Sequence, residues 1–232
     1  MNNELLLALS MVVMYAAVLL WYKLFGRSGL YCFVALVTVT ANIEVLIVID
    51  GFGLEQTLGN VAFASIFLAT DMLSEFEGKE AAAKAVKVGA ASLLLFMVMS
   101  QCWLLFTPSG SDWAKPSFDT LFANTPRVMI ASLVVYVISQ RLDVFLYHFY
   151  WKLTTGKTGD RERFLWLRNN GSTLTSQLVN TVLFNVLAFA GTYETGTLFS
   201  IIGAGYLIYI VTSLCDTPVM YLARSLKKAG KL

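Results

Sequence analysis

Seven stretches of the chain are apolar over a length that can cross a lipid bilayer. A membrane-spanning helix needs roughly 17–25 mostly apolar residues, and the candidates lie at about 5–24, 30–50, 57–75, 83–106, 127–150, 172–191 and 198–223. The third is the weakest, because its short apolar core runs into Asp71 and Glu75. We therefore expect an all-α, polytopic helical membrane protein with about six to seven transmembrane helices. Residues 1–232 would form a single integral membrane domain.

The composition supports a membrane protein and argues against a soluble domain. Hydrophobic residues make up 57% of the chain and charged residues 14%, whereas about a quarter of a soluble domain is charged. The longest polar stretch, near 152–172, is too short to fold into a separate soluble domain. Lys and Arg lie at the ends of the expected spans rather than in one patch, so no nucleic-acid partner is expected.

The distribution of Lys and Arg predicts the orientation in the membrane. Basic loops and loops without Lys or Arg alternate without a break when the third span is counted. Omitting that span would place Lys79, Lys84 and Lys87 outside, which the positive-inside rule disfavours. We expect a multi-pass protein of the inner (cytoplasmic) membrane, with the N-terminus outside and the C-terminus in the cytoplasm.

The sequence lacks the patterns of several enzyme classes. It contains no phosphate-binding GxxxxGK[ST] loop, no HExxH zinc motif and no GxSxG nucleophile motif. Its three cysteines lie apart in apolar segments and its one histidine lies among aromatic residues, so neither a disulfide framework nor a metal site is indicated. We expect no enzyme, no catalytic residue, no metal and no cofactor. An intramembrane enzyme using Asp71 and Asp216 stays as a remote alternative.

The sixth expected span begins with an unusually polar segment, RNNGSTLTSQLVNT at 168–181. On a helix, Thr173, Ser176, Gln177 and Asn180 share one face, because they follow the spacing i, i+3, i+4, i+7. Amides and hydroxyls avoid lipid tails and turn toward other helices or a cavity. This face suits a neutral, planar, hydrogen-bonding solute. The alternative is that these groups only join helices to one another.

The second and third expected spans carry acids and an amide. Asn42 lies inside the second span, where it contacts either a ligand or another helix. Asp71 and Glu75 are four residues apart in the third span, so both carboxylates lie on one helix face. They form a proton-responsive pair, accept hydrogen bonds from ligand ring N–H groups, or make ordinary salt bridges to Lys79 or Arg141.

The fifth and seventh expected spans add further polar groups. In the fifth, a stripe on one face contains Ser132, Tyr136, Ser139, Gln140 and Asp143. Arg127, at its outer end, either reaches the membrane surface or pairs with an acid. In the seventh, Asp216 and Thr217 precede Pro218, which predicts a kinked helix with a carboxylate near the break.

Four segments resemble a known family in their order along the chain. They are ATDMLSEFEG at 69–78, RVMIASLVVYVISQRLDV at 127–144, LWLRNNGSTLTSQLVNTVLFNVLAFAG at 165–191 and DTPVMYLAR at 216–224. With the spans between them, they resemble the vitamin uptake transporter (VUT) family of queuosine precursor transporters over most of the chain. The resemblance implies import of 7-deazapurine precursors of the modified tRNA base queuosine. It also implies a fold like that of the substrate-binding subunits of energy-coupling-factor vitamin transporters.

The resemblance also implies site residues. In this family the carboxylates would accept hydrogen bonds from the exocyclic amine and ring N–H of a 7-deazaguanine, amides would bind its carbonyl, and an aromatic ring would stack on it. The resulting substrate-binding candidates are Asn42, Asp71, Glu75, Arg127, Tyr136, Gln140, Gln177, Asn180, Phe184 and Asp216. Two positions depart from the family pattern: Asn180 stands where an acid is common, and Glu77 where an aromatic residue is common. An amide in place of an acid at residue 180 would affect the substrate specificity or the coupling of transport to its energy source.

The expected function is import of a queuosine precursor by alternating access around a polar pocket near mid-membrane. The candidates are 7-cyano-7-deazaguanine, 7-aminomethyl-7-deazaguanine and queuine. One alternative is a substrate-binding membrane module that requires a separate energising ATPase. Another is a transporter of a different vitamin or nucleobase. The expected partners are the small-molecule substrate and membrane lipid, and a homo-oligomer stays open.

Overall fold

A computed structural model describes residues 2–123, 126–159, 163–191, 194–230 and 232. The elements in chain order are α1 (Asn3–Glu44), β1 (Val48–Gly51), β2 (Leu54–Thr57), α2 (Gly59–Phe76), α3 (Lys79–Leu104), α4 (Lys115–Ala123), α5 (Pro126–Thr158), α6 (Leu165–Phe189) and α7 (Thr195–Lys228). Within these residues the protein is almost entirely helical, which confirms the expected all-α membrane class.

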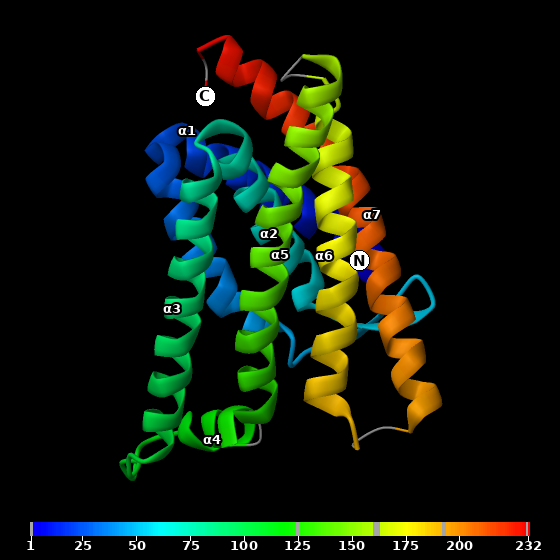
Figure 1. Cartoon of the computed structure of the whole chain (residues 1–232). Helices are drawn as coiled ribbons and strands as arrows, with labels where there is room; N and C mark the ends of the chain where they lie inside the picture. Colours follow the sequence, from blue (N-terminus) through cyan, green and yellow to red (C-terminus); the bar gives the residue numbers. More distant parts are fainter. Residues whose placement is uncertain (1, 124–125, 160–162, 192–193, 231) are drawn as a thin grey trace.

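The long helices α3, α5, α6 and α7 run along a common direction, and the short α4 lies across one end of the bundle (Figure 1). The most extensive packing joins α5 to α6 and α1 to α2. Four of the described helices, α1, α3, α5 and α7, are long and apolar enough to cross a membrane. The more polar α2 and α6 lie among them, with polar side chains buried in the protein.

The first two expected spans form one bent helix. α1 runs through both, and its backbone leaves helical geometry at Gly26, where φ is 59° and ψ is −145°. Residues with a Cβ rarely adopt these angles. Gly26 therefore turns the chain back into the bundle without a separate loop.

A β-hairpin occupies the region between the second and third expected spans. The expected second span reaches residue 50, but α1 ends at Glu44 and β1 pairs with β2 in antiparallel register. The turn residues Phe52 and Gly53 both have positive φ, as the common two-residue hairpin turn requires. Asn3 and Glu4, at the start of α1, hold the hairpin: Asn3 Nδ2 donates to the carbonyl of Asp50 at 2.7 Å, and Glu4 accepts from the amide of Phe52 at 3.2 Å.

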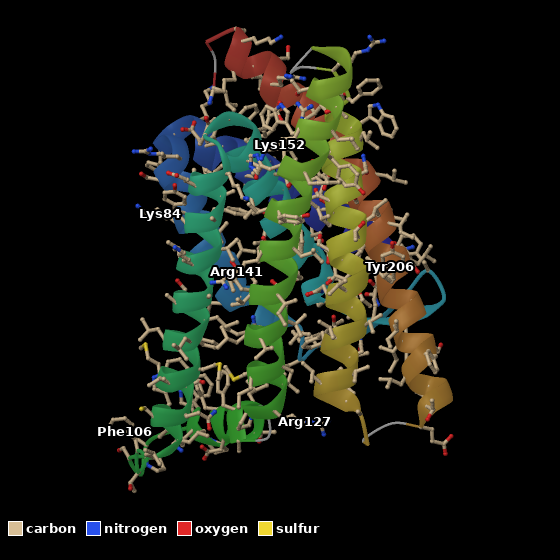
Figure 2. All side chains as sticks on the ribbon, viewed as in Figure 1. Lys84, Phe106, Arg127, Arg141, Lys152 and Tyr206 are labelled. Atoms are coloured by element: carbon tan, nitrogen blue, oxygen red, sulfur yellow. The ribbon has the colours of Figure 1, made fainter. Side chains whose placement is uncertain are left out.

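The side chains are distributed in the opposite way to those of a soluble protein. Large apolar residues such as Leu95, Val98, Phe145 and Leu214 are more than half exposed, whereas the polar faces of α2, α5 and α6 are buried. Of the basic side chains labelled in Figure 2, Lys84 and Lys152 lie toward the upper end, Arg141 lies about halfway along the bundle, and Arg127 lies at the other end. We call the upper end the basic end.

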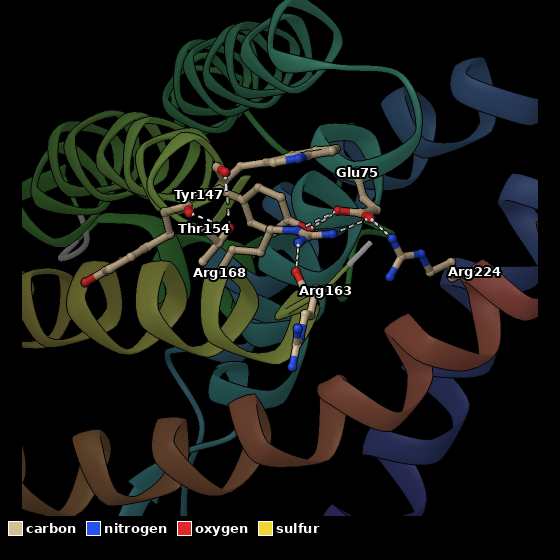
Figure 3. Close-up of polar contacts among 8 residues, drawn as sticks. Glu75, Tyr147, Thr154, Arg163, Arg168 and Arg224 are labelled. Carbon is tan, nitrogen blue, oxygen red and sulfur yellow. Dashed lines mark hydrogen bonds and ion pairs between the residues drawn. The ribbon is translucent and has the colours of Figure 1, made fainter. Parts of the chain in front are cut away.

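An ion cluster joins four elements near the basic end (Figure 3). The Glu75 carboxylate of α2 accepts from Arg168 Nε at 2.9 Å and from Arg168 Nη2 at 2.7 Å. It also accepts from the Tyr147 hydroxyl of α5 at 2.7 Å and lies 3.4 Å from Arg224 Nη2 of α7. The Arg168 side chain is fully buried, and its guanidinium lies over the Trp151 ring at 4.6 Å. The partners of Glu75 are thus arginines of α6 and α7, rather than the expected Lys79 or Arg141.

We expect Arg168→Met to destabilise the protein strongly, because it removes two hydrogen bonds from a buried carboxylate. Breaking a buried ion pair from one side costs about 3–5 kcal/mol. The matched control is Asp119→Asn, which removes the more exposed ion pair to Lys115 and should cost about 0.2–1 kcal/mol. Thermal unfolding in detergent measures both, and equal shifts in the two variants would contradict a structural role for the cluster.

We expect Gly26→Ala to lower the melting temperature through backbone strain alone. A Cβ at Gly26 meets no atom within 4 Å, so the substitution introduces no clash. A residue forced into such a backbone conformation costs about 1–3 kcal/mol. Gly203→Ala is the control, because Gly203 has the same open surroundings and lies inside α7, where alanine is the better helix former. The idea fails if the two variants shift the melting temperature alike.

Candidate functional site

A pocket opens in the half of the bundle away from the basic end. It lies between the end of α1, the strand β2, the start of α2, and the facing sides of α5, α6 and α7. Six elements of the fold therefore contribute side chains to one cavity.

Amides and hydroxyls supply the polar lining of the pocket. They belong to Asn42, Gln56, Thr57, Asn60, Ser132, Asn180, Thr181, Asn185 and Tyr209. Asn42 Nδ2 donates to the carbonyl of Thr38 at 2.8 Å, while its Oδ1 has no donor among the described residues. Both amide atoms of Gln56 are buried and likewise lack a partner in the described part of the chain. Buried polar groups without a partner are costly, and here they lie beside the pocket.

Aromatic rings supply flat apolar walls. Phe63 of α2, Phe184 of α6 and Tyr209 of α7 all line the pocket. Tyr136 lies behind Phe63, with the two ring centroids 6.2 Å apart in an edge-to-face arrangement. Tyr136 is itself fully buried and its hydroxyl lies against Gly89, where an added Cβ would approach to 2.0 Å. It therefore supports the wall of the pocket from behind and does not line it.

The chemistry of the lining favours a neutral, planar solute. The lining residues include no Lys or Arg, and Glu55 on β2 is their one carboxylate. Aromatic faces accept a flat ring, and a few amides fix its orientation by hydrogen bonds. No group of three or more metal-ligating side chains occurs among the described residues.

A second polar layer lies deeper, toward the basic end. Asn180 links it to the pocket, because its Oδ1 accepts from Ser139 of α5 at 3.3 Å. Gln140 Oε1 accepts from Thr70 of α2 at 3.2 Å. Gln177 is 1% exposed, and both of its amide atoms lack a partner within the residues that the structure describes. The predicted polar face of the sixth span therefore continues from the pocket into the protein core.

Three aspartates belong to this deeper layer, and all are buried. Asp71 accepts from Thr173 at 3.1 Å, and Asp143 accepts from Ser176 at 2.9 Å. Asp216 accepts from Asn169 at 2.6 Å. None of the three lines the pocket.

The structure therefore divides the predicted site residues into separate groups. It brings Asn42, Asn180 and Phe184 together in the pocket. It places Glu75 in the ion cluster, and Arg127 at the end of α6, where the guanidinium donates to the carbonyls of Leu187 and Ala190 at 2.9 and 2.7 Å. The other predicted residues lie behind the pocket wall or in the deeper layer: Asp71, Tyr136, Gln140, Gln177 and Asp216.

Several lining residues were not among the sequence candidates: Glu55, Gln56, Asn60, Asn185 and Tyr209. The first two lie on the hairpin, whose turn is Phe52-Gly53; Gly53 is the residue there that is typical of such a turn. Asn60 accepts from the hydroxyls of Thr57 and Tyr209, both at 3.2 Å. These bonds bring the hairpin, α2 and α7 together at one side of the pocket.

Comparison with known proteins gives consistent matches. A family described as "Putative vitamin uptake transporter" matches residues 57–223. A "Probable queuosine precursor transporter" of Bacillus subtilis (strain 168) is 39% identical over 215 residues, which cover 93% of this chain and 92% of that protein. The "Queuosine precursor transporter" of Escherichia coli (strain K12) is 29% identical over 155 residues, or 66% of this chain and 64% of that protein. No solved structure matches the chain at a significant level.

The family match covers well over half of the chain and includes α2, α3, α5, α6 and most of α7. It agrees with a helical protein whose apolar surface faces outward and whose polar groups line an internal cavity. This match and the relatives' names show that the family is one of transporters rather than enzymes. The chain belongs to the vitamin uptake transporter family of multi-pass membrane proteins.

Proposed function

We propose that the protein imports a queuosine precursor, a 7-deazaguanine or the related base queuine, across the cytoplasmic membrane. The relatives named above carry queuosine precursors by name. The observation that carries the proposal is the pocket with aromatic walls, amide groups and no basic side chain. A 7-deazaguanine ring is flat and nearly neutral, with one carbonyl edge and one amidine-like N–H edge. It needs both donors and acceptors around an apolar slot.

The pocket offers a partner for each part of such a ring. Phe184 and Phe63 would stack on its faces. The Asn180 amide would serve the carbonyl or a ring nitrogen. Glu55, the one lining carboxylate, suits the amidine-like edge, because two N–H groups pair well with one carboxylate. It takes the role that the sequence assigned to Asp71 and Glu75, neither of which lines the pocket.

The positions of pocket and cluster suit the outward-facing stage of an alternating-access cycle. The basic end is the cytoplasmic end if the positive-inside rule holds. The pocket then lies on the external side, and the Glu75–Arg168 cluster closes the path to the cytoplasm. Release of substrate inside would require the contacts among α2, α5, α6 and α7 at this cluster to separate.

Binding of three labelled ligands to the purified protein in detergent tests the substrate class. The ligands are 7-cyano-7-deazaguanine, 7-aminomethyl-7-deazaguanine and queuine. We expect at least one to bind at micromolar concentration or below. Glu55→Gln should weaken that binding by about tenfold or more, because it removes a charged hydrogen-bond acceptor worth roughly 1.5–3 kcal/mol. Thr175→Ala, on the exposed side of α6, should bind like the unaltered protein. If none of the three ligands binds, this substrate class is rejected.

Asn180→Asp should change the preference among the three ligands. A carboxylate at this lining position would pair with the ammonium group of 7-aminomethyl-7-deazaguanine, whereas the cyano compound has no positive charge to offer. We expect the ratio of the two affinities to shift toward the aminomethyl compound by roughly tenfold, the effect of about 1.4 kcal/mol. An unchanged ratio would place Asn180 out of reach of the substituent.

Transport by the protein alone separates an importer from a substrate-binding module. The purified chain is placed in liposomes without any ATPase, and entry of the bound precursor is measured against empty liposomes. We expect entry that saturates with substrate. Tight binding without entry would favour the module that needs a separate energising ATPase.

A further inference from the structure

The buried carboxyl groups of Asp71 and Asp143 form a pair in the middle of the protein. Asp71 lies on α2 and Asp143 on α5. Both side chains have no solvent exposure. They lie close together, because their hydroxyl donors Thr173 and Ser176 are one turn apart on the same helix, α6. Two ionised carboxylates repel strongly at such a distance in a low-dielectric interior. A proton or another cation between them would remove this repulsion.

The hydrogen bonds around the pair leave one position open. Thr173 donates to Asp71 Oδ2, and Ser176 donates to Asp143 Oδ1. The remaining oxygens, Asp71 Oδ1 and Asp143 Oδ2, are buried and receive no donor from any described residue. A buried acceptor without a donor is costly. One hydrogen shared by the two carboxyl groups would supply the missing donor and remove one of the two negative charges.

The charged side chains around the pair do not supply a positive charge that could take the place of the shared proton. Two hydroxyl groups of α6 donate hydrogen bonds to the pair. The buried Arg168 of the same helix binds Glu75 instead. Arg224 of α7 likewise lies against Glu75, at 3.4 Å. The other titratable groups that face this region are Tyr15 of α1, Glu75 of α2, Tyr147 of α5, and Cys215 and Asp216 of α7. These add no positive charge.

The pair is linked to the pocket through two helices. Asn180 and Ser176 are one turn apart on α6, and Ser139 and Asp143 are one turn apart on α5. Ser139 bonds to Asn180 at the pocket, and Ser176 bonds to Asp143 at the pair. A shift of α6 against α5 as the pocket fills would therefore alter the donors around the pair directly.

We propose that Asp71 and Asp143 together form a proton-binding site, which couples substrate import to the entry of one proton. This inference rests on the proposed function. The proton binds from outside and converts two carboxylates into one carboxyl–carboxylate pair with a single negative charge, holding α2 against α5. When the site opens to the cytoplasm the proton leaves, and the two carboxylates repel each other. No other reactant is needed, because the proton gradient of the membrane supplies the proton.

The first test needs no substrate. Infrared spectra of the purified protein at neutral pH should contain the C=O stretching band of a protonated carboxyl group. That band should be lost or clearly weakened in both Asp71→Asn and Asp143→Asn, because each removes one half of the pair. Glu80→Gln, which changes an exposed acid at the start of α3, is the control and should keep the band. A band that is unchanged in both pair variants, or absent from the unaltered protein, overturns the proposal. Absence together with sodium-dependent uptake would identify a sodium site instead.

The second test measures coupling in liposomes with 7-cyano-7-deazaguanine, or with whichever precursor binds. An inside-alkaline pH gradient should drive accumulation by the unaltered protein. Asp71→Asn and Asp143→Asn should each lose most of this accumulation while keeping exchange of labelled for unlabelled substrate at equal pH. Glu80→Gln, an exposed acid at the start of α3, should keep both activities.

The two tests separate the proposals from each other. Exchange that is unaffected by the pH gradient would overturn proton coupling and leave the importer intact. Absence of exchange with every precursor would reject the importer, and with it a coupling role for the pair. Loss of exchange in the aspartate variants alone would also overturn coupling, since it would show that the pair serves binding or folding.

Discussion

The arrangement of this protein depends on the cost of placing polar groups where water cannot reach them. Inside a membrane an unsatisfied donor or acceptor costs several kcal/mol, so polar side chains must find partners within the protein. The serines and threonines of α5 and α6 meet this demand through bonds to their own helix, such as Ser139 to Val135 at 2.8 Å and Thr181 to Gln177 at 2.8 Å. The groups left without partners are therefore informative, and they concentrate in the pocket and in the layer beneath it.

The fold class could be predicted from the sequence because it depends on local patterns. Apolar length alone indicates membrane helices, and four described helices meet that criterion. The hairpin could not be recognised as easily, because its short strands look like the end of one apolar span and the start of the next. The bend at Gly26 was equally hard to recognise. A glycine between two apolar segments fits a bend within one helix as well as a loop between two helices.

The candidate site was predictable where one helix carries the information. The face of α6 that contains Gln177 and Asn180 follows from helical spacing, and the structure buries it as expected. Pairing between distant residues was not predictable. Glu75 has Lys79 one turn away, yet its partner is Arg168, 93 residues later. In the same way, Asp143 accepts from Ser176 of another helix at 2.9 Å, and helical spacing carries no information about that contact.

The separation of pocket and acids bears on how such a protein can select and move its substrate. Glu55 is the one carboxylate of the pocket lining, and it lies on the exposed hairpin rather than in the protein core. Here the amides and rings face the pocket, while the three aspartates lie deeper among hydroxyl and amide donors of α6. In the proposed mechanism, substrate binding and charge compensation belong to adjacent layers that share α5 and α6. The contacts Ser139–Asn180 and Ser176–Asp143 lie one helix turn apart, so a movement of α6 against α5 would change both layers and couple the two sites.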